Sequence, residues 1–346
     1  MGKFDKSKVN KILVIKPAAI GDVLLSTPVI ENLRHNFPDA EINFLTQKYC
    51  KEVLTDNPFL TKVLTYDLKY DSTGFLIKHL SKQNYDLVID LFGNPRTAII
   101  TYFVDAKYRV GYKFNWRRFA YNIKVDRLKE EAHNIEFNLN SLRRLGLEII
   151  SKRPRFILNA IHKEFAEIFF DENNLRGFNV IGINPSGTWP TKVWYKEKFI
   201  ELGKKLSRNY KVLIFWGREK EKKEAEIIKE AIGENAILIP EVNLKYMGAL
   251  MEKCDAFITN DTGPMHIAWV LGVNTVAIFG PTNPKLQGPL SSNSIVLRNE
   301  SLKCLGCNLT CLEDCPYQHK CMTELGAEEV YHKLMMFLNS GTKVVH

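Results

Sequence analysis

The chain has 346 residues, of which 45% are hydrophobic and 25% are charged. This length suits two domains of ordinary size, and the composition is that of a globular protein rather than a disordered or membrane-embedded one. The net charge of +9 is uneven, because residues 1–177 carry 28 Lys and Arg against 21 Asp and Glu. We therefore expect an anionic partner to meet the N-terminal half.

The sequence shows no targeting signal. No apolar run approaches the roughly 20 residues needed to cross a bilayer. The first residues, MGKFDKSK, are polar and lead straight into a strand, which argues against a signal peptide. Lys6 stands where N-myristoylation requires Ser or Thr. We expect a cytoplasmic protein.

The N-terminal half begins with a predicted strand–helix–strand unit. Short apolar runs predict strands at residues 11–15 and 41–46, and helical periodicity covers residues 23–36, where Pro28 either kinks the helix or marks a restart. Asp22 lies between the first strand and the helix, where ligands bind in open α/β sheets. A helix N-cap is an equally good interpretation of Asp22.

Basic residues follow the next predicted strand, residues 87–91. Asn94 and Arg96 come directly after it and should emerge on the same sheet edge as Asp22. Residues 106–125, which include Arg117 and Arg118, hold six basic residues, six aromatic residues and no acidic ones. Such a segment can bind anionic groups while its rings cover apolar or sugar surface. A nucleic-acid site is the alternative, but no recognition motif of that class accompanies it.

The linkage between the domains is expected within residues 150–177, which contain a short predicted strand (156–158), an amphipathic helix (161–171) and a polar break. We therefore divide the chain into an N-terminal domain (1–160), a linker region (161–177), a second α/β domain (178–325) and a C-terminal helix and tail (326–346).

A loop that suits phosphate follows the first strand of the second domain, residues 179–183. Ser186, Gly187 and Thr188 offer hydroxyls and an accessible backbone, and Lys192 can neutralise a diphosphate. The spacing is not that of a Walker loop. Glu219, after the strand at residues 211–215, can accept hydrogen bonds from ribose hydroxyls, although a solvated helix start fits it nearly as well.

A second loop of this kind follows the predicted strand at residues 256–259. Thr262 is a natural N-cap for a helix at residues 264–271, and Gly263 lets a ligand approach the free N–H groups of the helix. Asp261 precedes them, and His266 in the first turn can donate a hydrogen bond to an anion. Alternatively, Asp261 and Thr262 merely cap a helix. Two such loops together favour phosphate binding.

Five of the seven cysteines form a cluster near the C-terminus: Cys304, Cys307, Cys311, Cys315 and Cys321. One C-x-x-C pair followed by further cysteines can supply a tetrahedral structural metal site. Against this, a second C-x-x-C pair is missing, and reduced thiols can simply be packed. Three of the cysteines are four residues apart and would share one face if the segment were helical.

Three segments together resemble glycosyltransferase family 9, the ADP-heptose:lipopolysaccharide heptosyltransferases. They are KILVIKPAAIGDVLLSTPVIENLR, NPSGTWPTKVW and NDTGPMHIAWVLGVNTVAIFGPTNP, and the resemblance runs from Lys11 to about Val330. It implies an α/β fold of the GT-B class, with two Rossmann-like domains facing across a cleft. The first domain would bind the acceptor, and the second would bind the nucleotide sugar.

The resemblance also implies roles for matching residues. Asp22 matches the general base, and Lys192 matches the lysine at the donor diphosphate. The remaining donor-binding matches are Ser186, Gly187, Thr188, Glu219, Asp261, Thr262, Gly263 and His266. Close members have Thr-Thr where this chain has Gly187-Thr188.

The expected reaction is transfer of heptose from ADP-heptose to the lipopolysaccharide inner core, with inversion at the anomeric carbon. No cofactor or catalytic metal is expected, because the sequence lacks a D-x-D motif. Asn94, Arg96, Arg117 and Arg118 are the expected acceptor-binding residues. The enzyme would work as a peripheral protein on the cytoplasmic face of the inner membrane, and nucleic acid is not an expected partner.

Two alternatives stay open at this stage. A nucleotide-sugar epimerase or hydrolase could be built on the same architecture. A non-catalytic module that binds anions or RNA could use the basic segment at residues 106–125. The fold by itself does not choose among these activities.

Overall fold

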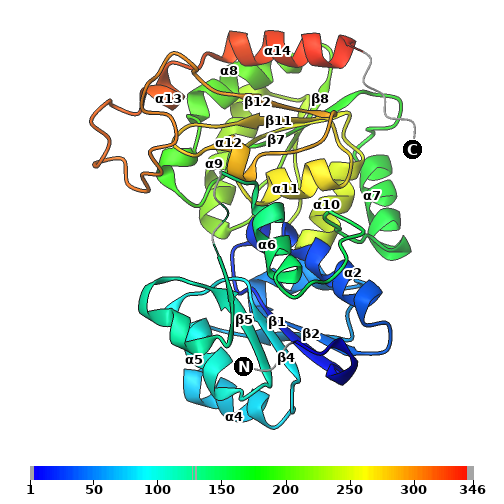
Figure 1. Ribbon diagram of the computed structural model, residues 1–346. Coiled ribbons are helices and arrows are strands. Elements are labelled where there is room, and N and C mark those ends of the chain that lie inside the picture. The colour runs from blue at the N-terminus through cyan, green and yellow to red at the C-terminus, as the bar shows by residue number, and fades with distance from the viewer. Residues whose placement is uncertain (1–3, 127, 129–130, 341–346) are drawn as a thin grey trace. The chain divides into compact units, whose positions relative to one another are not determined.

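The computed structural model describes residues 4–126, 128 and 131–340. The chain divides into two compact units, Met1–Ile157 and Leu158–His346. Each unit is built around one six-stranded sheet in which every pair of neighbouring strands is parallel (Figure 1). Helices connect the strands, as parallel crossovers require.

The sheet of the N-terminal unit has the strand order β3-β2-β1-β4-β5-β6. Its strands are β1 (Lys11–Ile15), β2 (Glu41–Gln47), β3 (Lys62–Tyr66), β4 (Leu87–Asp90), β5 (Tyr108–Tyr112) and β6 (Ile123–Val125). The α-helices of this unit are α1 (Ile20–Leu24), α2 (Thr27–Asn36), α3 (Lys51–Leu54), α4 (Thr73–Ser81), α5 (Pro95–Phe103) and α6 (Asn134–Arg143). Short 3-10 helices are η1 (Lys6–Lys8), η2 (Lys48–Cys50) and η3 (Asn115–Ala120).

The second sheet repeats this topology, with the order β12-β11-β10-β7-β8-β9. Its strands are β7 (Val180–Asn184), β8 (Lys211–Ile214), β9 (Ala236–Leu238), β10 (Ala256–Asn260), β11 (Thr275–Ile278) and β12 (Ser294–Leu297). The helices are α7 (Ala160–Glu172), α8 (Lys196–Leu206), α9 (Glu219–Ile232), α10 (Leu244–Glu252), α11 (Gly263–Val270), α12 (Pro284–Gln287), α13 (Lys320–Thr323), α14 (Ala327–Asn339) and the 3-10 helix η4 (Pro190–Lys192).

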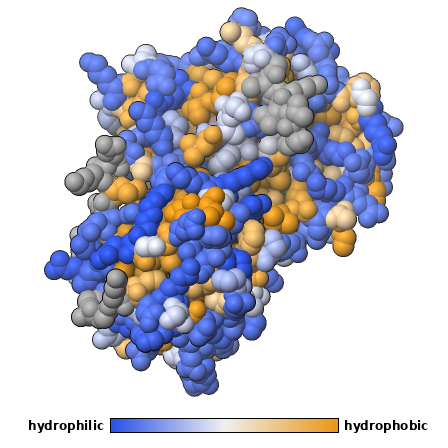
Figure 2. All heavy atoms as spheres, turned by 45° about the vertical axis from the view of Figure 1, so that its right-hand side comes forward, coloured by the Kyte–Doolittle hydropathy of each residue, from blue (hydrophilic) through white to orange (hydrophobic). Residues whose placement is uncertain are grey.

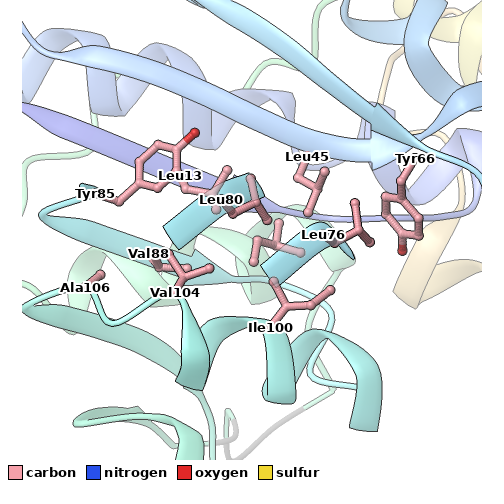
Figure 3. Close-up of a cluster of buried hydrophobic side chains, with 11 residues drawn as sticks. Leu13, Leu45, Tyr66, Leu76, Leu80, Tyr85, Val88, Ile100, Val104 and Ala106 are labelled. Atoms are coloured by element: carbon pink, nitrogen blue, oxygen red, sulfur yellow. The ribbon is translucent and has the colours of Figure 1, made fainter. Parts of the chain in front are cut away.

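One core of the N-terminal unit lies where α4 and α5 cover a face of the sheet (Figure 3). Leu13 and Val88 come from the central strands, and Leu76, Leu80 and Ile100 come from the two helices. All five are buried. The two central strands, β1 and β4, are covered on both faces, and apart from Lys11 and Asp90 at their ends they read in the sequence as apolar runs.

Both sheets have a topological switch point at the centre. The chain runs outward from β1 in one direction and from β4 in the other, and β7 and β10 stand in the same relation in the second sheet. The loops that leave the carboxyl ends of such a pair diverge and leave a crevice, which is where α/β sheets bind ligands. Most of the predicted site residues lie in the loops that follow these four strands, whereas Glu219 follows β8 and Arg117 and Arg118 follow β5.

Several details differ from the sequence-based expectation. The predicted helix at residues 23–36 is two helices, α1 and α2, so Pro28 belongs to a restart at Thr27. The expected strand at residues 156–158 is wrong, because that segment is irregular. The chain divides between Ile157 and Leu158, and α7 packs against α10 within the second unit.

No helix among the described residues combines the length and the hydrophobicity needed to cross a bilayer. Figure 2 shows one face of the molecule, on which hydrophilic residues predominate and hydrophobic residues form separate patches. Such patches are of interest, because large exposed hydrophobic areas on a protein mark binding surfaces.

Candidate functional site

The two predicted phosphate loops lie side by side in the second unit. Thr259, near the end of β10, stands opposite Asn184 at the end of β7. The loop with Ser186, Gly187 and Thr188 therefore leaves the sheet beside the loop that begins at Asp261. The sequence could not show this adjacency, because β10 lies next to β7 in the sheet although β8 and β9 come between them in the chain.

Asn260 ties the two loops together. Its side-chain amide donates hydrogen bonds to the backbone carbonyls of Pro185 (3.0 Å) and Ser186 (3.1 Å), and its oxygen accepts one from the backbone N–H of Trp194 (3.0 Å). Asn260 is fully buried. Sequence reasoning missed this residue, whose only signal was a polar side chain at the last position of an otherwise apolar strand.

Lys192 and Asp261 form a buried ion pair at the centre of the site. The Lys192 ammonium lies 2.7 Å from the Asp261 carboxylate, and the two side chains are 14% and 3% exposed. The same carboxylate accepts hydrogen bonds from the Thr282 hydroxyl (2.7 Å) and the Gln287 amide (2.8 Å). The Lys192 ammonium also lies 4.4 Å from the centre of the Trp189 ring. Lys192 is thus a positioned cation beside the phosphate loops.

The N-terminus of α11 opens on the same place. Thr262 is the N-cap residue, as predicted, but its side chain makes no capping hydrogen bond. Its hydroxyl instead donates a hydrogen bond to the backbone carbonyl of Asn260 (3.3 Å). Gly263 begins the helix, and His266 is buried one turn in. The N-terminal N–H groups of α11 are therefore not covered by the side chain of their own cap, which suits an anion.

Close packing fixes the other loop. A Cβ atom on Gly187 would lie 2.6 Å from a methyl carbon of Val193, so a larger side chain does not fit there. The Gly187 carbonyl accepts a hydrogen bond from the Arg218 guanidinium (3.1 Å), a partner that sequence reasoning missed. Arg218 caps α9, and its backbone N–H donates to Glu221 (3.0 Å). Glu219 is exposed beside it and takes no part in that cap.

The N-terminal unit places Asp22 at its own switch point. Asp22 is half-buried in the first turn of α1, where its carboxylate accepts a hydrogen bond from the backbone N–H of Ala19 (3.1 Å). Lys16 is buried next to this turn, and its ammonium donates to the carbonyl of Leu91 (3.2 Å). Burial lowers the pKa of Lys16, while attraction to Asp22 and Asp90 opposes that shift.

Asp90, at the end of β4, organises the neighbouring turn. It is buried, and it accepts hydrogen bonds from the N–H groups of Phe92 (3.0 Å) and Gly93 (2.9 Å) and from the Tyr121 hydroxyl (2.7 Å). Burial raises the pKa of Asp90, and these hydrogen bonds oppose the shift. Gly93 has a φ of +66°, a backbone conformation that favours glycine.

The predicted acceptor residues are placed as follows. The Asn94 side chain caps α5 by accepting a hydrogen bond from the Thr97 N–H (2.8 Å). Arg96 donates to the carbonyl of Asp71, and its guanidinium lies over the Tyr66 ring. Asp22, Asn94 and Arg96 share the carboxyl edge of the sheet, as the sequence predicts.

The other two predicted acceptor residues lie farther along the chain, on η3. The guanidinium of Arg117 is 5.7 Å from the centre of the Phe114 ring. Arg118 is exposed. These two positions follow β5, which is the neighbour of β4 in the sheet, and η3 packs against α5, the helix that carries Arg96.

Four of the five clustered cysteines, Cys304, Cys307, Cys315 and Cys321, line one cavity of about 290 Å³. All are free thiols, and Cys311 is exposed. Among the described residues no three His, Cys, Asp or Glu side chains are placed to hold a metal ion. The segment between β12 and α13 is irregular, so the cysteines do not share a helical face.

The cysteine-rich segment supports the phosphate loop. The imidazole of His319, which is buried, donates a hydrogen bond to the backbone carbonyl of Thr191 (2.7 Å). The Thr191 hydroxyl donates to the carbonyl of Leu309 (2.6 Å). These two hydrogen bonds therefore fix the backbone next to Lys192 through His319 and Leu309 of the cysteine-rich segment.

The chain is similar to known glycosyltransferases along most of its length. The sequence profile of glycosyltransferase family 9 (heptosyltransferase) matches residues 74–315, a range that includes the two phosphate loops and begins after Asp22. Lipooligosaccharide heptosyltransferase 2 of Haemophilus influenzae is 26% identical over 309 residues, which cover 83% of this chain and 88% of that protein.

Solved structures show the same fold. A family 9 glycosyltransferase from Veillonella parvula matches with a TM-score of 0.83 at 24% identity, over 96% of this chain and 98% of that one. ADP-heptose lps heptosyltransferase II of Escherichia coli matches with a TM-score of 0.76 at 21% identity, over 95% and 99% of the two chains. The predicted α/β fold of the GT-B class, with two Rossmann-like units, is confirmed.

Proposed function

Because the chain belongs to glycosyltransferase family 9, the heptosyltransferases, and is thus a glycosyltransferase, we propose that it transfers heptose from ADP-heptose to the inner core of lipopolysaccharide. The observation that carries the donor half of this proposal is the Lys192–Asp261 ion pair beside the open N-terminus of α11. A lysine and a helix N-terminus together form a strong site for a diphosphate.

The donor would bind across the switch point of the second sheet. The backbone of Ser186, Gly187 and Thr188 and the first turn of α11 would contact the diphosphate, and His266 would add a hydrogen bond. Lys192 would stabilise the negative charge that develops on the diphosphate as ADP leaves. Electrostatic stabilisation of this kind is usually the largest single contribution to lowering the barrier. Glu219, exposed at the start of α9, would accept hydrogen bonds from the ribose hydroxyls.

Asp22 would act as the general base. Its carboxylate is half-buried and accepts one backbone hydrogen bond, so it keeps lone pairs with which to take a proton from the acceptor hydroxyl. That hydroxyl would attack the anomeric carbon from the face opposite ADP, which inverts the configuration. We propose that Lys192 and the α11 N-terminus supply the positive charge that a divalent cation provides in D-x-D transferases.

The acceptor would be anionic and would meet the N-terminal unit. This proposal is supported by the charge imbalance of the two halves and by the basic side chains Arg96, Arg117 and Arg118. It agrees with the relative named above, which is a lipooligosaccharide heptosyltransferase. The enzyme would work as a peripheral protein on the cytoplasmic face of the inner membrane.

The variant Asp22→Asn tests the assignment of the base. The change keeps the shape of the side chain and removes its basicity, so ADP should bind with an unchanged dissociation constant in calorimetry. Transfer to the acceptor should fall by about 100-fold or more, the usual contribution of a general base. A variant that retains full turnover would refute this role for Asp22, while leaving the donor site untouched.

A further inference from the structure

Four aromatic side chains are exposed together on the N-terminal unit, on the two elements that also carry the predicted acceptor residues Arg96, Arg117 and Arg118. Tyr102 and Phe103 stand at the end of α5 and are 42% and 56% exposed. Trp116 and Phe119 belong to η3 and are 59% and 48% exposed. We call these four residues the aromatic patch. A folded protein normally leaves such rings exposed singly, so a group of four is unusual.

The rings form one continuous surface. Tyr102 contacts Phe103 and Phe119, with ring centres 5.1 Å and 5.4 Å apart. Phe119 stacks on Trp116 at 5.8 Å, with only 11° between the ring planes. Because α5 and η3 pack on each other, the patch is held on a defined support and needs no rearrangement to present its rings.

Basic side chains accompany the aromatic patch. The Arg109 guanidinium lies 5.8 Å from the centre of the Tyr102 ring, and Arg118 is exposed on η3 between Trp116 and Phe119. Lys107 is exposed in the segment that follows α5. Two acidic residues flank the segment. Asp126 pairs with Lys113 (2.6 Å), and Asp105 is exposed at the end of α5. The six basic residues at 106–125 still leave the segment with a positive charge.

We propose that the aromatic patch docks the protein on the surface of an anionic lipid bilayer. Exposed Trp and Tyr side chains with Lys and Arg beside them suit this partner, because aromatic side chains prefer the headgroup region and anionic lipids attract the cations. The inference rests on the proposed function in one respect, namely that a lipopolysaccharide acceptor is met at a bilayer.

Charge favours the bilayer over a second copy of the chain. In a symmetric dimer through this face, the basic residues around one patch would meet the same residues around the other, and like charges would repel. An anionic bilayer supplies the opposite charge.

Vesicle flotation of the full chain, without donor or acceptor, tests the proposal. Vesicles of phosphatidylcholine alone are compared with vesicles that contain about 30% phosphatidylglycerol, at low salt and at about 0.5 M salt. The double variant Trp116→Ala, Phe119→Ala removes the stacked pair. The matched control is Tyr70→Ala, Phe75→Ala, which removes two rings of the same unit that are 75% and 60% exposed and lie outside the patch.

The parent and the control should bind the anionic vesicles. The fraction of the patch variant that floats with the vesicles should be lower by at least about fivefold. Binding should fall on neutral vesicles and at high salt. The patch variant should keep the parent's melting temperature and its affinity for ADP, which is proposed to bind the other unit. If no acceptor is ever a substrate but vesicle binding follows this pattern, the proposed function fails and the docking surface stands.

Three results would overturn the proposal. The patch variant could bind vesicles as the parent does. The parent could bind neutral and anionic vesicles equally. Sedimentation could show a dimer of the parent that dissociates in the patch variant while neither binds vesicles, in which case the aromatic patch is an interface between copies of the chain.

Discussion

The ammonium of Lys192 lies 2.7 Å from the carboxylate of Asp261, although the two residues follow different strands of the sheet. The same carboxylate oxygen of Asp261 also accepts hydrogen bonds from Thr282 and Gln287, so the negative charge of Asp261 has three polar partners. This arrangement holds Lys192 in place before any ligand arrives. Such preorganisation means that little free energy is spent on reorienting the lysine when a diphosphate binds.

The first prediction concerns this lysine. Lys192→Gln should weaken ADP binding by about 10- to 100-fold, because a hydrogen bond between charged groups contributes about 1.5–3 kcal/mol. Calorimetric titration with ADP measures the change. The control is Lys196→Gln on α8, whose side chain is 41% exposed and should leave the affinity unchanged. Equal affinities for the parent and Lys192→Gln would remove this residue from the donor site.

The second prediction concerns the packing beneath the site. A Cβ atom on Gly182, in β7, would lie 2.6 Å from a ring carbon of Phe257 and 3.0 Å from one of Phe215. Gly182→Ala should therefore lower the free energy of unfolding by about 1–3 kcal/mol through overpacking. Gly74→Ala is the control, since nothing lies within 4 Å of that position and alanine favours the helix. Urea unfolding compares the two.

A loss of stability in both variants, or in neither, would contradict this account of β7. Gly182 precedes the phosphate loop by only a few residues, so the same experiment also asks whether the strand positions the loop. A destabilised Gly182→Ala protein should bind ADP less tightly at a temperature where it is still folded.

The sequence alone predicted the central strands and the loops that follow them. Residues 11–15 and 87–91 are short and apolar except for Lys11 and Asp90, because both faces of β1 and β4 are covered, and such runs are easy to recognise. Four strands, β3, β5, β6 and β12, are not predictable from such runs. Arg109 interrupts β5, and β3 is largely exposed or half-buried, so neither reads as a buried strand.

The candidate site was predicted as residues but not as a set of contacts. Asp261 and Lys192 were identified singly, whereas the roles of Asn260 and Arg218 depend on which strands are neighbours in the sheet. A sequence does not state the strand order. Contacts between loops that are distant in the chain therefore needed the structure.

The third prediction concerns pH. The Arg155 guanidinium donates hydrogen bonds to Glu31 at 2.7 and 2.9 Å and lowers the pKa of that carboxyl from its usual value. The stabilisation is therefore complete above the unfolded-state pKa and is lost as the pH falls through the folded-state pKa. The melting-temperature difference between the parent and Glu31→Gln should shrink as the pH is lowered from about 6 to about 3.

The control for this titration is Glu197→Gln on α8, whose side chain is 68% exposed. Its melting temperature should follow that of the parent at every pH. A difference for Glu31→Gln that is the same at both ends of the pH range would show that the ion pair contributes nothing to acid sensitivity.

The fourth prediction orders the thiols by reactivity. Burial, followed by repulsion from the neighbouring thiols Cys307, Cys315 and Cys304, raises the pKa of Cys321 to about 11. Because the thiolate is the reacting form, iodoacetamide at a mildly basic pH should modify the exposed Cys311 well before Cys321. Peptide mass mapping over time gives the order, and the unfolded protein, in which the rates should converge, is the control. Equal rates in the folded protein would contradict the burial of Cys321.

The most direct test of the proposed function is mass spectrometry of reaction products. The protein is incubated with ADP-heptose, or with UDP-sugars, and a panel of truncated lipopolysaccharide acceptors. We predict that one acceptor gains the mass of a single heptosyl unit with ADP-heptose, and that ADP-heptose is stable when no acceptor is present. Rapid consumption of ADP-heptose without an acceptor, or no mass gain on any acceptor, would contradict the proposal.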